Sequence, residues 1–214
     1  MKRQAGIWDF WASHYDRLWV QTVSLIPTRA ALRAQLSGGP HGRLLDMGCG
    51  TGQLLGELPA FWGDQPTGCG YTGVDASSAM IAVARRKHPA AHFECADVMS
   101  YAAAAESFDT IVCAHAFPYM RAQPAALSRL AGWLRPGGRL LLAQACTESL
   151  SDRIVLALVK RTTSPARYLS VAELCAVARP LLGEPREIAQ INRLRGVPSI
   201  RLVVWEKHAG VAWP

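Results

Sequence analysis

The chain has 214 residues, half of them apolar and 18% charged, which suits one globular domain and excludes wholesale disorder. No apolar run approaches the ~18 residues of a membrane-spanning helix, and the N-terminus lacks the apolar stretch of a secretory signal. The net charge is +7, and residues 151–214 carry +5 of it through ten basic and five acidic side chains. We therefore expect a soluble, cytoplasmic protein without a membrane partner.

The chain begins with a segment that we expect to be helical. Trp8, Trp11 and Tyr15 recur at helical spacing, and Pro27 interrupts the pattern before it resumes. The sequence Ser-Gly-Gly-Pro at 37–40 ends this unit.

Short apolar strands then alternate with amphipathic helices. The expected strands are 43–47, 71–75, 92–96, 110–114 and 140–145, and the expected helices are 53–58, 77–87 and 125–134. We also expect a turn-rich loop at 63–70, a helix cap at Ser77 or Ser78, and a turn at 136–138. This alternation predicts a doubly wound, Rossmann-like α/β fold, with a parallel sheet covered by helices on both faces.

The pattern is looser after residue 145. Residues 152–161 and 170–178 are expected helices, the second capped by Ser170 and closed by Pro180. Residues 187–192 and 200–206 are the last expected strands. Only about seven residues join them, too few for a crossover helix, so we expect this pair to be antiparallel.

The strongest local signal is a glycine-rich loop between the first strand and the helix after it. Gly48, Gly50 and Gly52 permit positive φ angles and let a ligand approach the backbone closely. Gln53 stands where the dinucleotide fingerprint requires its third glycine. Asp46, inside the end of the strand, would repel a pyrophosphate and would favour a cationic ligand.

Two further acids follow the next two expected strands. Asp75 ends the second strand, where a carboxylate can accept hydrogen bonds from ribose hydroxyls. Asp97 follows the third strand and could accept a bond from an adenine amine. The apolar side chains that could enclose such a base are those of Ala76, Met80 and Val98. The loop and the acids should meet at one edge of the sheet, where open α/β sheets bind ligands.

At these positions the sequence resembles the class I S-adenosylmethionine-dependent methyltransferases. The matching segments occur in order at 44–52, 73–80, 96–98, 107–112 and 134–141. The resemblance implies a seven-stranded sheet whose last strand is antiparallel. It also implies S-adenosyl-L-methionine as the cofactor and S-adenosyl-L-homocysteine as its product.

The resemblance also assigns roles to residues around the cofactor. The glycine loop would pass its methionine part, and the backbone near Cys113 and Ala114 would bind its amino group, with Asp46 nearby. Tyr15 would close over the methionine carboxylate, or else pack between helices. The complete expected set is Tyr15, Asp46, Gly48, Cys49, Gly50, Gly52, Asp75, Ala76, Met80, Asp97, Val98 and Ala114.

We expect residues 1–214 to form one methyltransferase domain with four parts. These are an N-terminal helical lid at 1–39, a cofactor-binding core at 40–146, an insertion at 147–169, and the last helix with the antiparallel strand pair at 170–214. Outside the cofactor-binding core, the lid and the insertion are the segments that could form the acceptor pocket. Its lining could include side chains of the insertion, which could instead pack between helices: Leu150, Ile154, Leu158 and Tyr168.

The expected reaction is an in-line displacement by an O, N, S or C nucleophile of a small, partly hydrophobic molecule. A general base is needed only for a protonated nucleophile, and His115 is the candidate, with Tyr119 as the alternative. No acidic cluster follows the fourth strand, and the six cysteines and six histidines form no recognisable metal motif, so we expect no metal.

Other interpretations remain open. An RNA or protein methyltransferase would use the basic C-terminal third, although the dispersed cations make a nucleic-acid partner less favoured. A non-catalytic scaffold would keep the cofactor site alone, and an NAD-dependent oxidoreductase is a more distant alternative. The sequence is compatible with a monomer or a homodimer.

Overall fold

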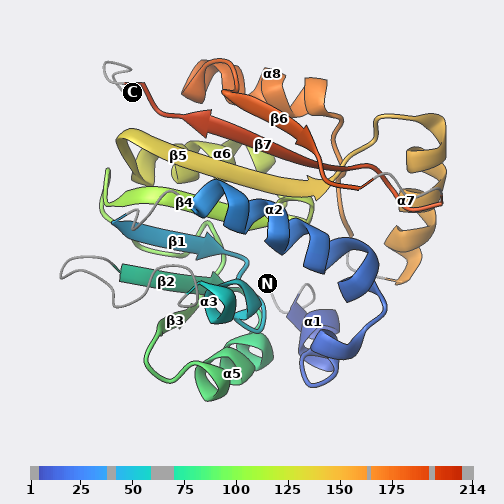
Figure 1. The fold of residues 1–214 in the computed structure, drawn as a ribbon, viewed down its shortest axis with the longest axis horizontal. Coiled ribbons are helices and arrows are strands. Elements are labelled where there is room, and N and C mark those ends of the chain that lie inside the picture. The colour runs from blue at the N-terminus through green and yellow to red at the C-terminus, as the bar shows by residue number, and fades with distance from the viewer. Residues whose placement is uncertain (1–4, 38–41, 59–69, 163–164, 193–195, 209–214) are drawn as a thin grey trace.

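The computed structural model describes residues 5–37, 42–58, 70–162, 165–192 and 196–208 (Figure 1). Most of the loop expected at 63–70 lies outside these residues. Within them, no helix combines the length and the apolar character needed to cross a membrane.

Seven strands form one sheet in the order β3-β2-β1-β4-β5-β7-β6. The strands are β1 Arg43–Met47, β2 Gly70–Asp75, β3 His92–Cys95, β4 Phe108–Ala114, β5 Leu134–Ala145, β6 Glu187–Gln190 and β7 Ile200–Glu206. The pairs among β1 to β5 are parallel, whereas β7 runs antiparallel to both β5 and β6. The predicted Rossmann-like sheet with an antiparallel last strand is confirmed.

Helices cover both faces of this sheet (Figure 1). They are α1 Ala5–Trp11, η1 Tyr15–Arg17, η2 Gln21–Leu25, α2 Ile26–Leu36, α3 Gln53–Glu57, α5 Ser78–Lys87, η3 Phe117–Tyr119, α6 Gln123–Trp133, α7 Leu150–Thr162 and α8 Val171–Leu182. The sheet has a hydrophobic core on each face. Alternate side chains of a strand enter different cores, because successive residues point to opposite faces. Ile111 joins the core beneath α6 and α8, while Val112 joins the core beneath α2 and α3.

Two of the helix N-caps expected from the sequence are present in the structure. The Ser77 hydroxyl accepts a hydrogen bond from the Met80 N–H and caps α5. Ser170 caps α8 and forms a capping box with Glu173. Pro27 stands in the first turn of α2, which follows the π-helical turn η2 without a break, so the interruption expected there is a change of helix type within one continuous helical stretch.

Two predicted boundaries are wrong by more than two residues. Pro180 does not close α8, which continues to Leu182 and ends where Gly183 adopts φ 73°. In the last turn, Pro180 forfeits one backbone bond while Leu182 gains a buried position. The turn expected at 136–138 lies inside β5, because Gly137 donates to the Lys207 carbonyl and Gly138 accepts from the Lys207 N–H.

Candidate functional site

The carboxyl ends of β1, β2 and β4 meet at one edge of the sheet and bring the glycine loop to Asp75. One oxygen of Asp75 accepts the Gly50 N–H at 2.9 Å, and the other accepts the Ser77 N–H at 2.8 Å. The N–H groups of Gly48 and Cys49 both bond the Val74 carbonyl at the end of β2. The loop and β2 are therefore held as one unit.

Asp75 keeps capacity for a ligand despite these two bonds. Each carboxylate oxygen has a second acceptor position, so the pair can receive two hydroxyls of a diol. Burial raises the pKa of Asp75, and the N–H groups of Ser77 and Gly50 oppose that rise. A ligand that donates hydrogen bonds would stabilise the charged form further.

The glycine loop is closely packed at Gly48 and has open space next to Gly50. Gly48 and Gly50 have φ angles of 84° and 54°, which favour glycine. A Cβ at Gly48 would lie 2.1 Å from the Ala116 Cβ, whereas a Cβ at Gly50 would meet only the Tyr15 ring, at 3.9 Å. Gly48 is therefore needed for packing, and Gly50 leaves room for a ligand.

These two glycines give a matched pair of variants. We expect Gly48→Ala to destabilise the fold by roughly 2–5 kcal/mol, from left-handed backbone strain of ~1–2 and overpacking of ~1–3 kcal/mol. Gly50→Ala carries only the strain and should lose roughly 1–2 kcal/mol. Urea unfolding of both variants measures the difference, and equal losses would contradict the packing asymmetry.

Asp46 lies buried at the end of β1, and the Tyr71 hydroxyl donates to one of its oxygens at 2.6 Å. Burial raises the pKa of Asp46 to about 7; the Tyr71 bond opposes this rise, and the nearby Asp75 charge adds to it. Such a group favours a cation beside it, because a positive charge would stabilise its ionised form.

The residues expected around the adenine base differ in their burial and hydrogen bonding. One oxygen of Asp97 accepts the N–H groups of Met99 and Ser100, so this carboxylate shapes the turn after β3. Val98 is buried in the core beneath α6, and Met80 is buried against Ala12, which directly follows α1. Ala76 is exposed directly after β2.

The N-terminal segment, residues 5–37, is bonded to this edge of the sheet at several points. Asp9 accepts from the Ser77 hydroxyl and from the Ala79 N–H, at the start of α5. Asp16 accepts from the Thr51 hydroxyl at 2.7 Å. Tyr15 lies between these anchors and faces Gly50. Burial raises its pKa, and the charges of Tyr119 and Asp75 add to the rise.

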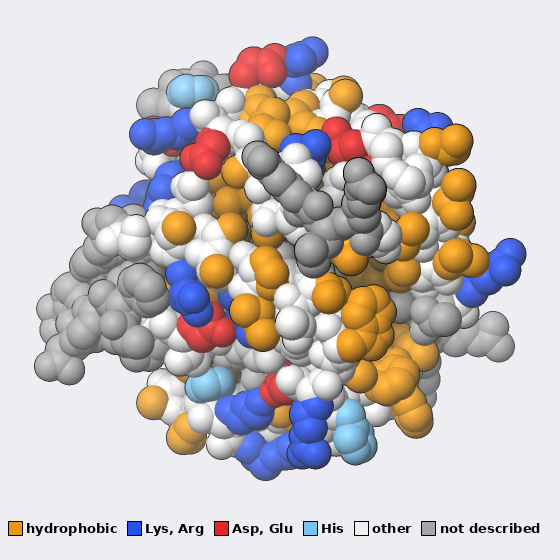
Figure 2. Space-filling view, turned by 45° about the vertical axis from the view of Figure 1, so that its right-hand side comes forward, with side chains coloured by type: hydrophobic (Ala, Val, Ile, Leu, Met, Phe, Trp, Pro, Cys, Tyr) orange, Lys and Arg blue, Asp and Glu red, His pale blue; other side chains and the backbone are white. Residues whose placement is uncertain are grey.

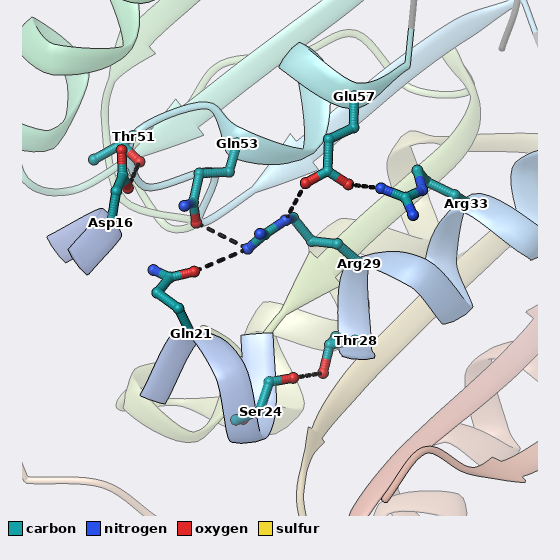
Figure 3. Close-up of polar contacts among 9 residues, drawn as sticks. All are labelled: Asp16, Gln21, Ser24, Thr28, Arg29, Arg33, Thr51, Gln53 and Glu57. Carbon is teal, nitrogen blue, oxygen red and sulfur yellow. Dashed lines mark hydrogen bonds and ion pairs between the residues drawn. The ribbon is translucent and has the colours of Figure 1, made fainter. Parts of the chain in front are cut away.

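Arg29 of α2 joins the N-terminal segment to α3 (Figure 3). Its Nε donates to Glu57 at 2.7 Å, and one Nη donates to Gln21 and to Gln53 at 3.1 and 3.0 Å. Gln21 in turn donates to the Tyr15 carbonyl. Sequence reasoning did not find Arg29, because its partners on α3 lie 24 and 28 residues away along the chain. Gln53, at the altered glycine position, was the available signal.

His115 follows β4 in a strained conformation. Its φ is 56°, its N–H donates to the Ala143 carbonyl at 2.7 Å, and its Nε2 lies 2.9 Å from the Thr28 hydroxyl. The Ser24 hydroxyl lies 3.4 Å from the same nitrogen. Burial lowers the pKa of His115 to about 4, so the imidazole is neutral at pH 7.

Aromatic side chains from three separate segments meet next to this site. The rings of Trp8 and Tyr119 pack edge to face with centroids 5.1 Å apart, and the hydroxyls of Tyr119 and Tyr168 are 3.1 Å apart. Trp8 also packs edge to face on Tyr15. The cluster joins the N-terminal segment, the turn after β4 and the stretch after α7.

The other expected pocket residues lie elsewhere. Leu150, Ile154 and Leu158 of α7 point outward and are 73%, 57% and 55% exposed. Figure 2 shows apolar side chains gathered on the right-hand side of the face drawn. Among the described residues, no three His, Cys, Asp or Glu side chains are grouped as a metal site requires.

Comparison with known proteins gives consistent results. A family described as a methyltransferase domain matches residues 12–179. Over 155 residues, 72% of the chain, it is 32% identical to a malonyl-[acyl-carrier protein] O-methyltransferase of Enterobacter lignolyticus. Over 175 residues, 81% of the chain, it is 30% identical to a trans-aconitate 2-methyltransferase of Sinorhizobium medicae. The matches cover 59% and 63% of these relatives.

A solved structure from Thermotoga maritima, described as an S-adenosylmethionine-dependent methyltransferase and possible histamine N-methyltransferase, has a similar fold. It superposes with a TM-score of 0.71 at 19% identity, covering 94% of this chain and 99% of that one.

Proposed function

The chain belongs to the class I S-adenosylmethionine-dependent methyltransferases, and from this premise we propose that it methylates a small, partly hydrophobic molecule. The observation that carries the proposal is the meeting of the open glycine loop, Asp75 and buried Asp46 at one edge of the sheet.

The residues at this edge fit the cofactor. Asp75 has two oxygens for a ribose diol, and Asp46 supplies a negative charge for the ammonium and sulfonium groups. The space in front of Gly50 admits a ligand against the backbone. Tyr15, whose ring faces Gly50, and Arg29, which reaches Gln53 at the start of α3, are two groups of the N-terminal lid that can receive a carboxylate. Asp97 has a second oxygen for an adenine amine, and Ala76, directly after β2, is exposed.

When bound, S-adenosylmethionine would supply an electrophilic methyl group for attack by the acceptor. The chain then has to hold the acceptor in line and exclude water, and positioning of this kind lowers barriers by roughly 7–11 kcal/mol. The bonds of Asp9, Asp16 and Arg29 hold the N-terminal lid over the loop and suit it to that task. His115 would take a proton from an acceptor that arrives protonated.

The aromatic cluster of Trp8, Tyr119 and Tyr168 supports a partly hydrophobic acceptor. Two relatives act on malonyl-[acyl-carrier protein] and trans-aconitate, according to their names, so an oxygen acceptor is the first to be tried. A nucleic-acid acceptor is less favoured. In the basic C-terminal third, Arg179 and Arg186 already pair with surface carboxylates, which offset their positive charge.

Thermal unfolding with separate additions of S-adenosylmethionine, S-adenosylhomocysteine and NAD tests the cofactor site. A ligand at about 100 times its dissociation constant stabilises by ~2.7 kcal/mol, or roughly 5–10 °C for a domain of this size. We expect this shift with both adenosyl ligands and none with NAD.

Transfer is then measured with radioactive methyl donor and a panel of small acids, phenols and amines, with RNA as a comparison. Absence of a shift with either adenosyl ligand would contradict the cofactor assignment. A shift without transfer to any acceptor would favour a scaffold over an enzyme.

A further inference from the structure

The hydrogen bonds around Thr28 determine which nitrogen of His115 carries the proton. The Thr28 hydroxyl lies 2.8 Å from the Ser24 carbonyl, four residues earlier, and 2.9 Å from the His115 Nε2. A carbonyl only accepts, so the single hydroxyl proton of Thr28 belongs to the bond with Ser24. If that proton pointed to His115 instead, two acceptor oxygens would be left in contact at 2.8 Å.

The Thr28 oxygen can therefore only accept from His115, and Nε2 must carry the hydrogen. A neutral imidazole has one N–H, so Nδ1 holds the free lone pair. The low pKa of His115 agrees with a neutral ring. The Ser24 hydroxyl, 3.4 Å from Nε2, is a second and weaker partner for the same N–H.

The backbone on both sides of this contact is unusual. His115 has a left-handed φ of 56°, a strained conformation that persists only where the surroundings impose it. Ser24 belongs to a π-helical turn, Gln21–Leu25, and such turns occur frequently at functional sites. Thr28 is fully buried at the start of α2. The N-terminal segment thus meets His115, directly after β4, through Thr28 and, more weakly, through Ser24.

We infer that Thr28 is a positioning residue that holds His115 as the Nε2–H tautomer, so that Nδ1 is the atom that accepts the acceptor's proton. This inference rests on the proposed methyl transfer. The proton leaves the acceptor heteroatom for Nδ1, and the heteroatom keeps the electron pair with which it bonds the methyl carbon. The sulfur–methyl bond of the donor would break at the same time, and its electron pair would stay on the sulfur of the leaving thioether. Nε2–H remains bonded to Thr28 throughout, and Nδ1 later returns its proton to water.

The test is a long-range ¹H–¹⁵N spectrum of the full chain with ¹⁵N-labelled histidine at pH 7.5. The signals of His115 are assigned by their loss in His115→Gln. We expect the Nε2–H tautomer in the parent and in Thr28→Ser, which keeps the hydroxyl. Thr28→Val keeps the shape without the hydroxyl and should lower the ratio of Nε2–H to Nδ1–H at least tenfold. Ser24→Ala should change the ratio less.

The Nδ1–H tautomer in the parent, or an unchanged ratio in Thr28→Val, would overturn the inference. With a protonated acceptor, we expect kcat to fall at least tenfold in Thr28→Val, to recover in Thr28→Ser, and KM to change little. Equal kcat in parent and Thr28→Val would likewise overturn it. The spectrum needs no methyl transfer, and the thermal shift with S-adenosylhomocysteine needs no tautomer, so failure of the proposed function is seen separately.

Discussion

Replacing Asp75 by alanine is expected to weaken S-adenosylmethionine binding by roughly 10²–10⁴-fold, because hydrogen bonds to a charged group contribute ~1.5–3 kcal/mol each and two are lost. Both Asp75 oxygens lie within the site, fixed by the N–H groups of Gly50 and Ser77. Titration calorimetry of parent and variant measures the change.

Two controls separate lost recognition from lost structure. Asp75→Glu keeps two acceptor oxygens on a longer side chain and should retain part of the affinity. Glu184→Ala removes a surface carboxylate whose partner is Arg179 and should bind as the parent does. The melting temperature of each ligand-free variant reports on folding. If folded Asp75→Ala binds as tightly as the parent, Asp75 does not hold the ribose.

Replacing Asp46 by asparagine is expected to remove a pH-dependent loss of stability on the order of a few kcal/mol. The pKa of Asp46 is about 7 in the folded chain and 3.8 is its ordinary value. As pH rises from 4 to 7, the unfolded chain ionises this carboxyl while the folded chain keeps it protonated. Stability therefore falls across that window and is level above it.

Urea unfolding at half-unit steps between pH 4 and pH 8 measures this effect as the difference between parent and Asp46→Asn. His115 contributes the opposite slope, because its pKa is lowered and its stabilisation is lost as pH falls below its ordinary value of 6.5. That contribution is common to both proteins and cancels in the difference. Tyr71→Phe removes the bond that lowers the Asp46 pKa and should extend the window upward. Parallel curves for parent and Asp46→Asn would show that Asp46 ionises freely.

Much of the fold follows from local patterns. The bounds of β1, the N-cap at Ser77 and the full extent of β7 agree with expectation. Apolar runs, caps and glycines report the hydrogen bonding of their own segment, so one sequence suffices to find them. The expected roles of the glycine loop and Asp75 rest on the same kind of signal, since both end predicted strands. Where a boundary was wrong, as at Pro180, a buried position further along outweighed the local signal.

Contacts between distant segments were decided only by the tertiary structure. The bond between Thr28 and His115 joins residues 87 positions apart, and Arg29 reaches α3 across 24 and 28 positions. Leu150 and its neighbours on α7 have the spacing of a packed helix face but point outward. Residue spacing shows which face of an element is apolar, but not which other element that face will meet. That choice depends on how the faces pack together, and it placed Thr28 of the N-terminal segment against His115.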